Sequence, residues 1–311
     1  MRVALTRPLL ILIALQALAG PLDAQLEPPG TGGVVALDRE LRMLGHYRRV
    51  LMIGAHPDDE DTELLTVLVR GLGAETAYLS LTRGEGGQNL IGPELGEALG
   101  LIRTEELLAA RRIDGARQYF TRAYDFGFSK TVEDTYRHWP KDTILGDVVR
   151  VVRAFRPHVI VPVFSGTPRD GHGHHQVSGI LAREVFDAAA DTVRYPSRGF
   201  GPGWATSKLY HQRTYWNHEG ATYRYDAGEY DPVLGMSYAE IAARSRSQHK
   251  SQAFGSLEPK GAVVGSLARE RTRVNERTPA AQERGIFDGI DTTWARLGPA
   301  MKRVEPEGQT G

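Results

Sequence analysis

Short hydrophobic runs alternate with stretches of helical periodicity along the middle of this chain. The runs at 49–55, 76–81 and 158–164 are apolar or β-branched and short enough to be buried strands. Apolar residues recur at helical spacing between them, which predicts helices at 58–71, 97–118, 143–155 and 176–190. Alternating strands and helices over residues 45–190 imply an α/β fold with a mostly parallel sheet flanked by helices. One more strand is expected within 209–216.

The two ends of the chain differ from this middle region. Residues 1–24 combine a basic start with an apolar run of about eleven residues, which is the pattern of a signal peptide rather than a membrane span. Cleavage after Ala24 is expected, with Ala19 as the rival position and an uncleaved anchor or a buried helix as the alternatives. We therefore expect export to the periplasm or the medium. Residues 25–44, which begin rich in Pro and Gly, predict a linker.

The main domain is expected at residues 45–265, followed by a charged, helical C-terminal extension at 266–311. Within the domain, residues 237–255 predict a helix that mixes Ser, Arg, Gln and His. We favour a solvated face for this helix, His249 included, over contact with the mouth of a site. After cleavage of residues 1–24, no segment has the length and apolarity of a membrane span.

The composition of the chain excludes several classes of function and of metal site. The 311 residues include 38 Lys+Arg and 38 Asp+Glu, so the formal net charge is zero and general nucleic-acid binding through basicity is not expected. The sequence contains no cysteine, which excludes disulfides, a thiol nucleophile and thiolate zinc sites. A metal would have to be held by nitrogen and oxygen ligands. Neither G-x-S-x-G nor H-E-x-x-H is present, so serine hydrolases and zincins lack their signatures.

Two polar clusters follow predicted strands. The first, AHPDDE at 55–60, contains one imidazole and three carboxylates, and the second, DGHGHH at 170–175, contains three imidazoles. Ligands of open parallel sheets bind beyond the carboxyl ends of the strands, so folding should bring the clusters together. Each alone has an ordinary explanation, as a helix cap or a solvated loop. Together they predict a catalytic metal site with three protein ligands and a position left for water.

These motifs resemble the PIG-L/LmbE-like family of zinc-dependent N-acetylglucosaminyl deacetylases. The resemblance rests on AHPDDE, TRGEGG at 82–87, R-x-x-E beginning at Arg103 and HGHHQ at 172–176, and it covers roughly residues 45–255. It implies a Rossmann-like fold and one Zn²⁺ ion, with Fe²⁺ as an alternative. AHPDDE is the most specific of these signatures, and the other motifs are weaker when taken alone.

The resemblance also implies roles for individual residues. The metal ligands would be His56, Asp59 and His175, the general base would be Asp58, and His172 would assist at the oxyanion or donate a proton. The family's distal motif usually reads H-P-D-H, so Gly173 and His174 depart from it, and His174 competes with His175 as the third ligand. Substrate hydroxyls would be bound by Arg103 and, through a looser match, Asp125.

Arg83 lies in the glycine-rich motif and is a further candidate substrate-binding residue, with an exposed surface loop as the alternative. The function that these features imply is hydrolytic removal of an N-acetyl group from an N-acetylglucosamine-type sugar or glycoconjugate. The substrate would be a small molecule or a glycan. Two alternatives stay open: an amidase that acts on a non-sugar amide, and a non-catalytic binding module that has kept the metal. The presence of both Asp58 and His172 argues against the second, because holding a metal requires neither.

Overall fold

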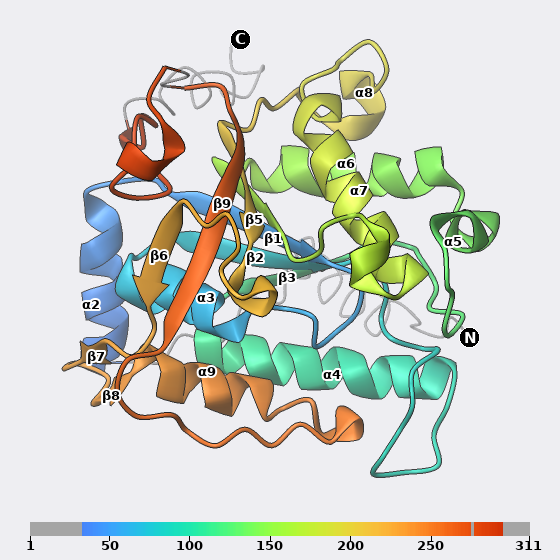
Figure 1. The fold of residues 1–311 in the computed structure, drawn as a ribbon, viewed down its shortest axis with the longest axis horizontal. Coiled ribbons are helices and arrows are strands. Elements are labelled where there is room, and N and C mark those ends of the chain that lie inside the picture. The colour runs from blue at the N-terminus through green and yellow to red at the C-terminus, as the bar shows by residue number, and fades with distance from the viewer. Residues whose placement is uncertain (1–32, 275–276, 295–311) are drawn as a thin grey trace, which may run out of the picture.

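A seven-stranded sheet forms the centre of the molecule in the computed structural model, which describes residues 33–274 and 277–294 (Figure 1). The strand order is β3-β2-β1-β4-β5-β9-β6, and the first five strands are parallel. The last two run antiparallel to their neighbours. The strands are β1 Arg49–Gly54, β2 Glu75–Ser80, β3 Arg117–Phe120, β4 Val159–Pro162, β5 Lys208–Gln212, β6 Tyr223–Asp226 and β9 Val264–Thr272, with β7 Tyr230–Asp231 and β8 Met236–Ser237 in a separate small sheet.

Helices cover both faces of the sheet. One face carries α5 Val132–His138, α6 Lys141–Phe155 and α7 Gly173–Ala188, and the other carries α3 Thr62–Thr66, which continues as the π-helical turn η1 Val67–Gly71, together with α4 Glu97–Asp114 and α9 Tyr238–Arg246 (Figure 1). The remaining helical segments are α2 Gly33–Leu44, α8 Ser197–Phe200, η2 Pro168–Asp170, η3 Thr214–Trp216, η4 Lys250–Gln252 and η5 Ala280–Gln282.

The side chains of β1 point alternately to the two faces of the sheet and are apolar on both, which explains why helices cover both faces. Leu51 and Ile53 belong to the core beneath α6 and α7, whereas Val50 and Met52 belong to the core beneath α3 and α9. All four side chains are fully buried. A strand that is apolar on both faces must be central, because each face needs a layer of helices to remove it from water.

The strand order places a topological switch point between β1 and β4. The chain proceeds from β1 outward to β2 and β3, then returns to the other side of β1 to form β4 and β5. Connections on opposite sides leave a crevice beyond the carboxyl ends of the two neighbouring strands. The two polar clusters follow these two strands, at residues 55–60 and 170–175. The α/β fold with a mostly parallel, helix-flanked sheet is therefore confirmed.

Several boundaries differ from the sequence-based expectation. The predicted helix at 97–118 ends at Asp114, because Gly115 adopts a left-handed φ of 86°, and the chain then enters β3. Helix α7 begins at Gly173 rather than 176, so His174 and His175 lie on its first turn. Residues 33–44 of the expected linker form α2, whose Arg42 donates a hydrogen bond to the Gly71 carbonyl.

The prediction of a helical extension at 266–311 is wrong for residues 266–272, which belong to strand β9. Strand β9 crosses the predicted boundary at 265 and pairs with both β5 and β6 inside the main sheet. Its burial explains the difference, because Leu267 is fully buried within a segment whose later charged side chains lie at the surface. Residues 1–24, the predicted signal peptide, lie outside the described residues. Among the described residues, no helix is both long and apolar enough to cross a bilayer.

Candidate metal centre and active site

A cavity of about 350 Å³ opens beyond the carboxyl ends of β1 and β4. Both polar clusters contribute to its wall, together with the glycine-rich loop after β2 and the loop after β3. The lining residues are His56, Asp58, Asp59, Gly86, Gly87, Gln88, Arg103, Asp125, Gly127, Phe128, His172, His175 and Gln252. Seven of the eight residues predicted for metal binding, catalysis or substrate contact line this cavity, because the fold joins distant segments of the chain.

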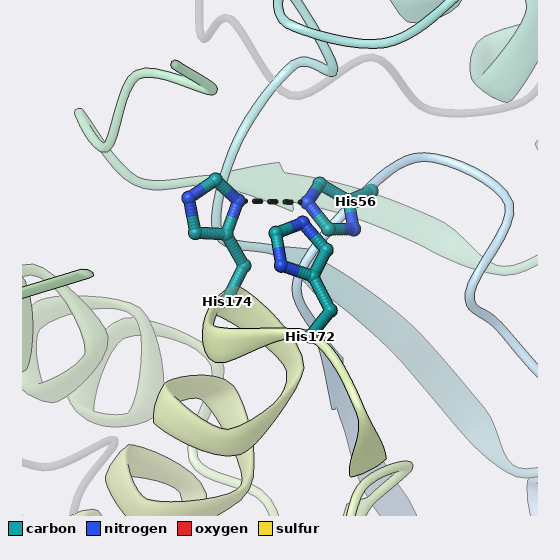
Figure 2. A group of neighbouring side chains, drawn as sticks. All are labelled: His56, His172 and His174. Atoms are coloured by element: carbon teal, nitrogen blue, oxygen red, sulfur yellow. Dashed lines mark hydrogen bonds between the residues drawn. The ribbon is translucent and has the colours of Figure 1, made fainter. Parts of the chain in front are cut away.

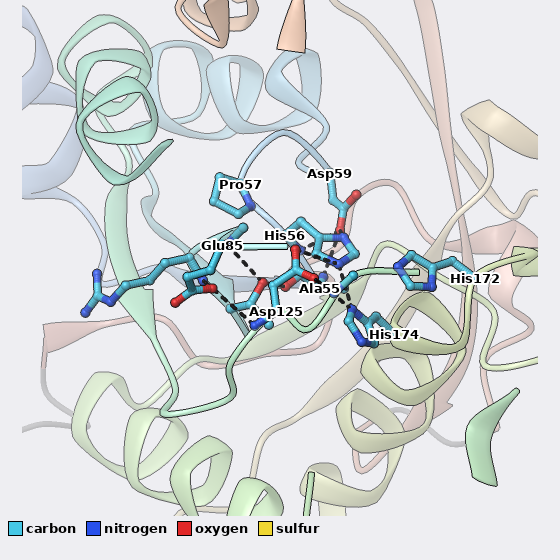
Figure 3. Close-up of polar contacts among 12 residues, drawn as sticks. Ala55, His56, Pro57, Asp59, Glu85, Asp125, His172 and His174 are labelled. Atoms are coloured by element: carbon cyan, nitrogen blue, oxygen red, sulfur yellow. Dashed lines mark hydrogen bonds and ion pairs between the residues drawn. The ribbon is translucent and has the colours of Figure 1, made fainter. Parts of the chain in front are cut away.

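The turn after β1 is folded around the carboxylate of Asp59. Its Oδ2 accepts hydrogen bonds from the backbone amides of Ala55, at 2.9 Å, and His56, at 2.7 Å (Figure 3). The hydroxyl of Tyr78, on the neighbouring strand, donates to the His56 carbonyl at 2.6 Å. These contacts hold His56 and Asp59 in fixed positions, and among the described residues both backbone donors are directed at Oδ2 of Asp59 rather than Oδ1.

His56, Asp59 and His175 present one donor atom each, and these atoms lie within 4.8 Å of one another. Nδ1 of His56 is 3.4 Å from Asp59 Oδ2, and Nε2 of His175 is 3.5 Å from Asp59 Oδ1. Ligands of a tetrahedral zinc with bonds near 2.0 Å are separated by about 3.3 Å. The set of two imidazoles and one carboxylate therefore fits a divalent ion in both chemistry and spacing.

The electrostatics of Asp59 agree with that fit. Burial alone would raise the pKa of this carboxyl, but the His175 and His56 rings beside it hold the pKa well below its usual range. The carboxylate is therefore kept ionised, which is the form that binds a cation. His175 itself is oriented from its other ring nitrogen, because Nδ1 lies 3.3 Å from the Asp170 carbonyl.

A second group of donors shares His56. Nε2 of His56 lies 3.0 Å from Nδ1 of His174, and His172 lies beside both rings (Figure 2). His174 is fully buried, stacks on Trp139 with ring centroids 4.3 Å apart, and does not line the cavity. Burial lowers the pKa of His174 to about 2, and the neighbouring His56 ring adds to the effect. This second group has no carboxylate.

Asp58 has an unusual backbone conformation. Its φ of 97° is rare for a residue with a side chain and marks local strain. Hydrogen bonds from several directions hold it: Glu60 Oε2 accepts from the Asp58 amide at 2.9 Å, and Arg246 donates to the Asp58 carbonyl at 3.2 Å. Arg103 Nη2 donates to the Pro57 carbonyl and lies 3.1 Å from Asp58 Oδ1. The strained turn therefore directs a carboxylate into the cavity.

Burial raises the pKa of Asp58 above its usual range, against the opposing effect of Arg103. A carboxylate whose pKa is raised toward neutrality can both take and return a proton. Arg103 is buried and is held by Asp58 and by the carbonyls of Pro57 and Gly84. It lines the cavity, but its main contacts are with the turn that carries Asp58.

His172 and Phe128 also line the cavity. The Phe128 ring is 72% exposed and stacks on His172 with centroids 5.0 Å apart. Nδ1 of His172 lies 3.0 Å from the Ser129 carbonyl. Burial lowers the pKa of His172 to about 4, with the nearby His56 ring contributing.

Asp125 is another lining residue: its Oδ1 accepts a hydrogen bond from the Gly127 amide, and its Oδ2 is 3.8 Å from His56 Nε2 (Figure 3). The glycine-rich loop packs tightly here. A Cβ at Gly86 would lie 2.2 Å from the Gly127 amide nitrogen, so only glycine allows this approach.

Comparison with known proteins agrees with the motifs. Residues 51–186 match the family model of PIG-L, described as GlcNAc-PI de-N-acetylase. The matched span includes both polar clusters and covers less than half of the 311 residues. A mycothiol S-conjugate amidase of Streptomyces coelicolor is 27% identical over 179 residues, covering 53% of this chain and 60% of the relative. A 1D-myo-inositol 2-acetamido-2-deoxy-alpha-D-glucopyranoside deacetylase of Geodermatophilus obscurus is 32% identical over 181 residues, covering 52% and 60%.

The chain thus spans about 60% of the length of these curated relatives. Among solved structures, the N,N'-diacetylchitobiose deacetylase of Pyrococcus horikoshii aligns with a TM-score of 0.51 and 20% identity, covering 66% of this chain and 70% of that one. At this identity the likeness supports the fold alone.

One predicted residue, Arg83, lies away from the cavity. Arg83 is exposed, and its guanidinium lies over the Phe120 ring, 4.2 Å from the centroid, while Nη1 reaches the Thr104 hydroxyl at 3.4 Å. It is absent from the cavity wall. The cation–π contact draws the side chain outward, so the structure does not place Arg83 where it would touch a substrate.

The sequence alone did not reveal the buried charges that support the turn at residues 55–60. Glu60 is fully buried and pairs with Arg111 at 3.1 Å and with His249 at 2.7 Å. Arg111 in turn pairs with Asp114 at 2.7 Å. Their only signal in the sequence is that Glu60 belongs to the AHPDDE motif, because Arg111 and His249 have the spacing of ordinary surface residues.

Proposed function

We propose that this chain is a metal-dependent hydrolase that removes an N-acetyl group from an N-acetylglucosamine-type sugar or glycoconjugate. The observation that carries the proposal is the convergence of His56, Asp59 and His175 on one point of a cavity that also contains Asp58. Two imidazoles and a carboxylate with a free side toward a cavity are the ligand set of a catalytic zinc site. The names of the relatives support the reaction class.

The ion would be held by His56, Asp59 and His175 rather than by His56, His172 and His174. Only the first group includes an anionic ligand, and His175 lines the cavity whereas His174 does not. Bound there, Zn²⁺ or Fe²⁺ would supply the Lewis acidity that makes water a nucleophile at neutral pH. Asp58 lies beside this position and accepts the proton of the attacking water, with Arg103 holding one oxygen of its carboxylate.

Asp58 is also the group placed to return that proton to the leaving amine. His172 directs Nδ1 at the Ser129 carbonyl, so a neutral His172 ring that donates there has only an acceptor at Nε2. Assistance at the oxyanion would need the protonated ring, which the lowered pKa of His172 opposes at neutral pH. We therefore assign the proton to Asp58 and an orienting role to His172.

The cavity offers complementary surfaces for a sugar. Phe128 presents an exposed aromatic face beside His172, and Asp125 and Arg103 supply polar groups to the same cavity. These features favour a ring with hydroxyls over a simple aliphatic amide. From the pattern of residues 1–24 we further propose that the enzyme is exported.

Acetate release by the full chain tests this proposal. The protein is stripped with a chelator, reloaded with Zn²⁺ or Fe²⁺, and assayed on N-acetylglucosamine glycosides beside non-sugar acetamides. We expect metal-dependent release from the glycosides, retained metal without turnover in Asp58→Asn, and lost metal affinity in His175→Ala. Asp134→Ala, an exposed change on α5, is the control. Hydrolysis of the non-sugar amides alone would favour an amidase, and no turnover with metal bound would contradict hydrolysis.

A further inference from the structure

His174 stands where the family motif has aspartate, and the structure gives it a place of its own. It is fully buried on the first turn of α7, between Trp139 and Phe126, whose ring centroids lie 4.3 and 4.5 Å away. It is not part of the cavity wall. A side chain in this position does not meet a substrate, so its chemistry must act through a neighbouring group.

That neighbour is His56. The two nitrogens of the His56 ring face different partners: Nδ1 lies 3.4 Å from Asp59 Oδ2, and Nε2 lies 3.0 Å from His174 Nδ1 (Figure 2). If Nδ1 is the donor toward the ion, it must carry a lone pair, and the ring proton must be on Nε2. Nδ1 of His174 is then the acceptor of that proton.

The other imidazole ligand has a comparable arrangement. His175 turns Nε2 toward Asp59 and Nδ1 toward the Asp170 carbonyl, 3.3 Å away. Histidines that bind metals usually donate their second N–H to a carboxylate, a carbonyl or water, which fixes the tautomer and the ring orientation. For His56 an imidazole takes this place. Asp125 is the nearest alternative, but its Oδ2 is 3.8 Å away, beyond a hydrogen bond.

A second observation fits the same assignment. Nε2 of His174 is buried and has no hydrogen-bond partner among the described residues. A buried polar atom without a partner lowers the stability of the folded state. An apolar side chain would therefore suit this pocket better than histidine unless Nδ1 of His174 had a role. The contact between His174 and His56 is the polar interaction that keeps a histidine in this aromatic pocket.

We propose that His174 is a positioning residue whose Nδ1 accepts the Nε2–H of His56 and so keeps Nδ1 of His56 available to a divalent ion. The inference rests on the metal site of the proposed function. It predicts that both rings carry their proton on Nε2 in the zinc-loaded protein. It also predicts that an acceptor at position 174 is needed for tight binding, whereas the aromatic ring itself is not.

Two variants of similar size separate the acceptor from the packing. His174→Leu removes the acceptor, whereas His174→Asn keeps an amide oxygen close to the place of Nδ1. We measure the zinc affinity of the full chain by competition with a chelator and check folding by thermal unfolding of the metal-free proteins. His174→Leu should weaken zinc binding by about 10- to 100-fold. His174→Asn should recover most of that loss.

Nuclear magnetic resonance of the zinc-loaded wild type gives a readout independent of activity. A scalar coupling between Nε2 of His56 and Nδ1 of His174 is expected across the hydrogen bond. A proton found on Nδ1 of His174, equal zinc affinity in wild type and His174→Leu, or equal losses in the Leu and Asn variants would each overturn the inference. A wild type that binds no divalent ion would instead contradict the proposed function, so the two failures are distinguishable.

Discussion

Replacing Arg111 with methionine should destabilise the protein far more than the same change at the surface. Arg111, Glu60 and Asp114 are all buried to within 1% exposure, and Arg111 Nη2 lies 3.1 Å from Glu60 and 2.7 Å from Asp114. Methionine has a similar length but no charge, so the variant leaves two carboxylates buried together without their common cation. Removing one partner of a buried ion pair typically costs about 3–5 kcal/mol.

The contacts that remain place the expected loss near the lower end of that range. Glu60 keeps His249 Nε2 at 2.7 Å, and Asp114 keeps the Ser245 hydroxyl at 2.7 Å. We therefore expect the free energy of unfolding to fall by about 3 kcal/mol, since each carboxylate retains a hydrogen-bond donor. Urea denaturation measures this change as a lower midpoint at an unchanged slope.

Arg137→Met is the matched control, because Arg137 pairs with Asp134 at the same i,i+3 spacing but is 73% exposed. Pairs of this kind contribute about 0–1 kcal/mol. The difference between the two variants should also shrink in acid. The His249 and Arg111 charges hold the pKa of Glu60 well below its usual range, so its contribution is present above the unfolded pKa and fades as pH falls toward the folded one. A loss below 1 kcal/mol for Arg111→Met, or one equal to the control, would refute this reasoning.

Other perturbations test the cavity and its frame. Phe128→Ala removes the exposed aromatic face and should raise KM about fivefold with little change in kcat, corresponding to about 1 kcal/mol of lost contact; unchanged KM in steady-state assays would argue against stacking. Gly173→Ala would bring a Cβ within 2.4 Å of the Thr131 carbonyl oxygen, so thermal unfolding should show a loss of about 1–3 kcal/mol. Zinc at 100 times its Kd should raise stability by about 2.7 kcal/mol, and a chelator should reverse the rise in Tm; no shift would contradict binding to the folded state.

The sheet and its helices were predictable because their apolar residues repeat with clear periods. Each of β1, β2 and β4 corresponds to a short apolar run, since a strand buried on both faces has no polar positions to interrupt it. Strand β9 was missed for the opposite reason. Only its central residues are buried, and its later Arg and Glu side chains give it the composition of a solvated helix. Burial of a strand in the middle of a sheet depends on its neighbours, which a local pattern does not report.

Some positions of the site residues could likewise be expected from local motifs and the sheet topology, whereas others depend on packing from distant segments. His56, Asp58 and Asp59 follow a strand in one short motif, so their meeting with His172 and His175 could be expected from the topology of a parallel sheet. The position of Arg83 outside the cavity wall could not be expected, because a glycine-rich motif gives no information on which way a long side chain turns. His249 was expected in solvent, yet it is fully buried against Glu60, because α9 packs on the turn from a distant part of the chain.

The two departures from the family motif have one structural cause. Gly173 is enclosed by the Thr131 carbonyl and the hydroxyls of Thr135 and Ser129, each within 2.6 Å of where a Cβ would stand. The Gly173 amide also donates to the Ser129 carbonyl at 2.8 Å, a bond that the proline of the usual motif could not make. This close approach brings the start of α7 against the loop before α5 and directs the next side chain toward Trp139. A flat ring fits between Trp139 and Phe126, and its Nδ1 contacts His56. The two departures from the motif are therefore coupled: glycine at 173 allows the close approach that places histidine at 174 in this pocket.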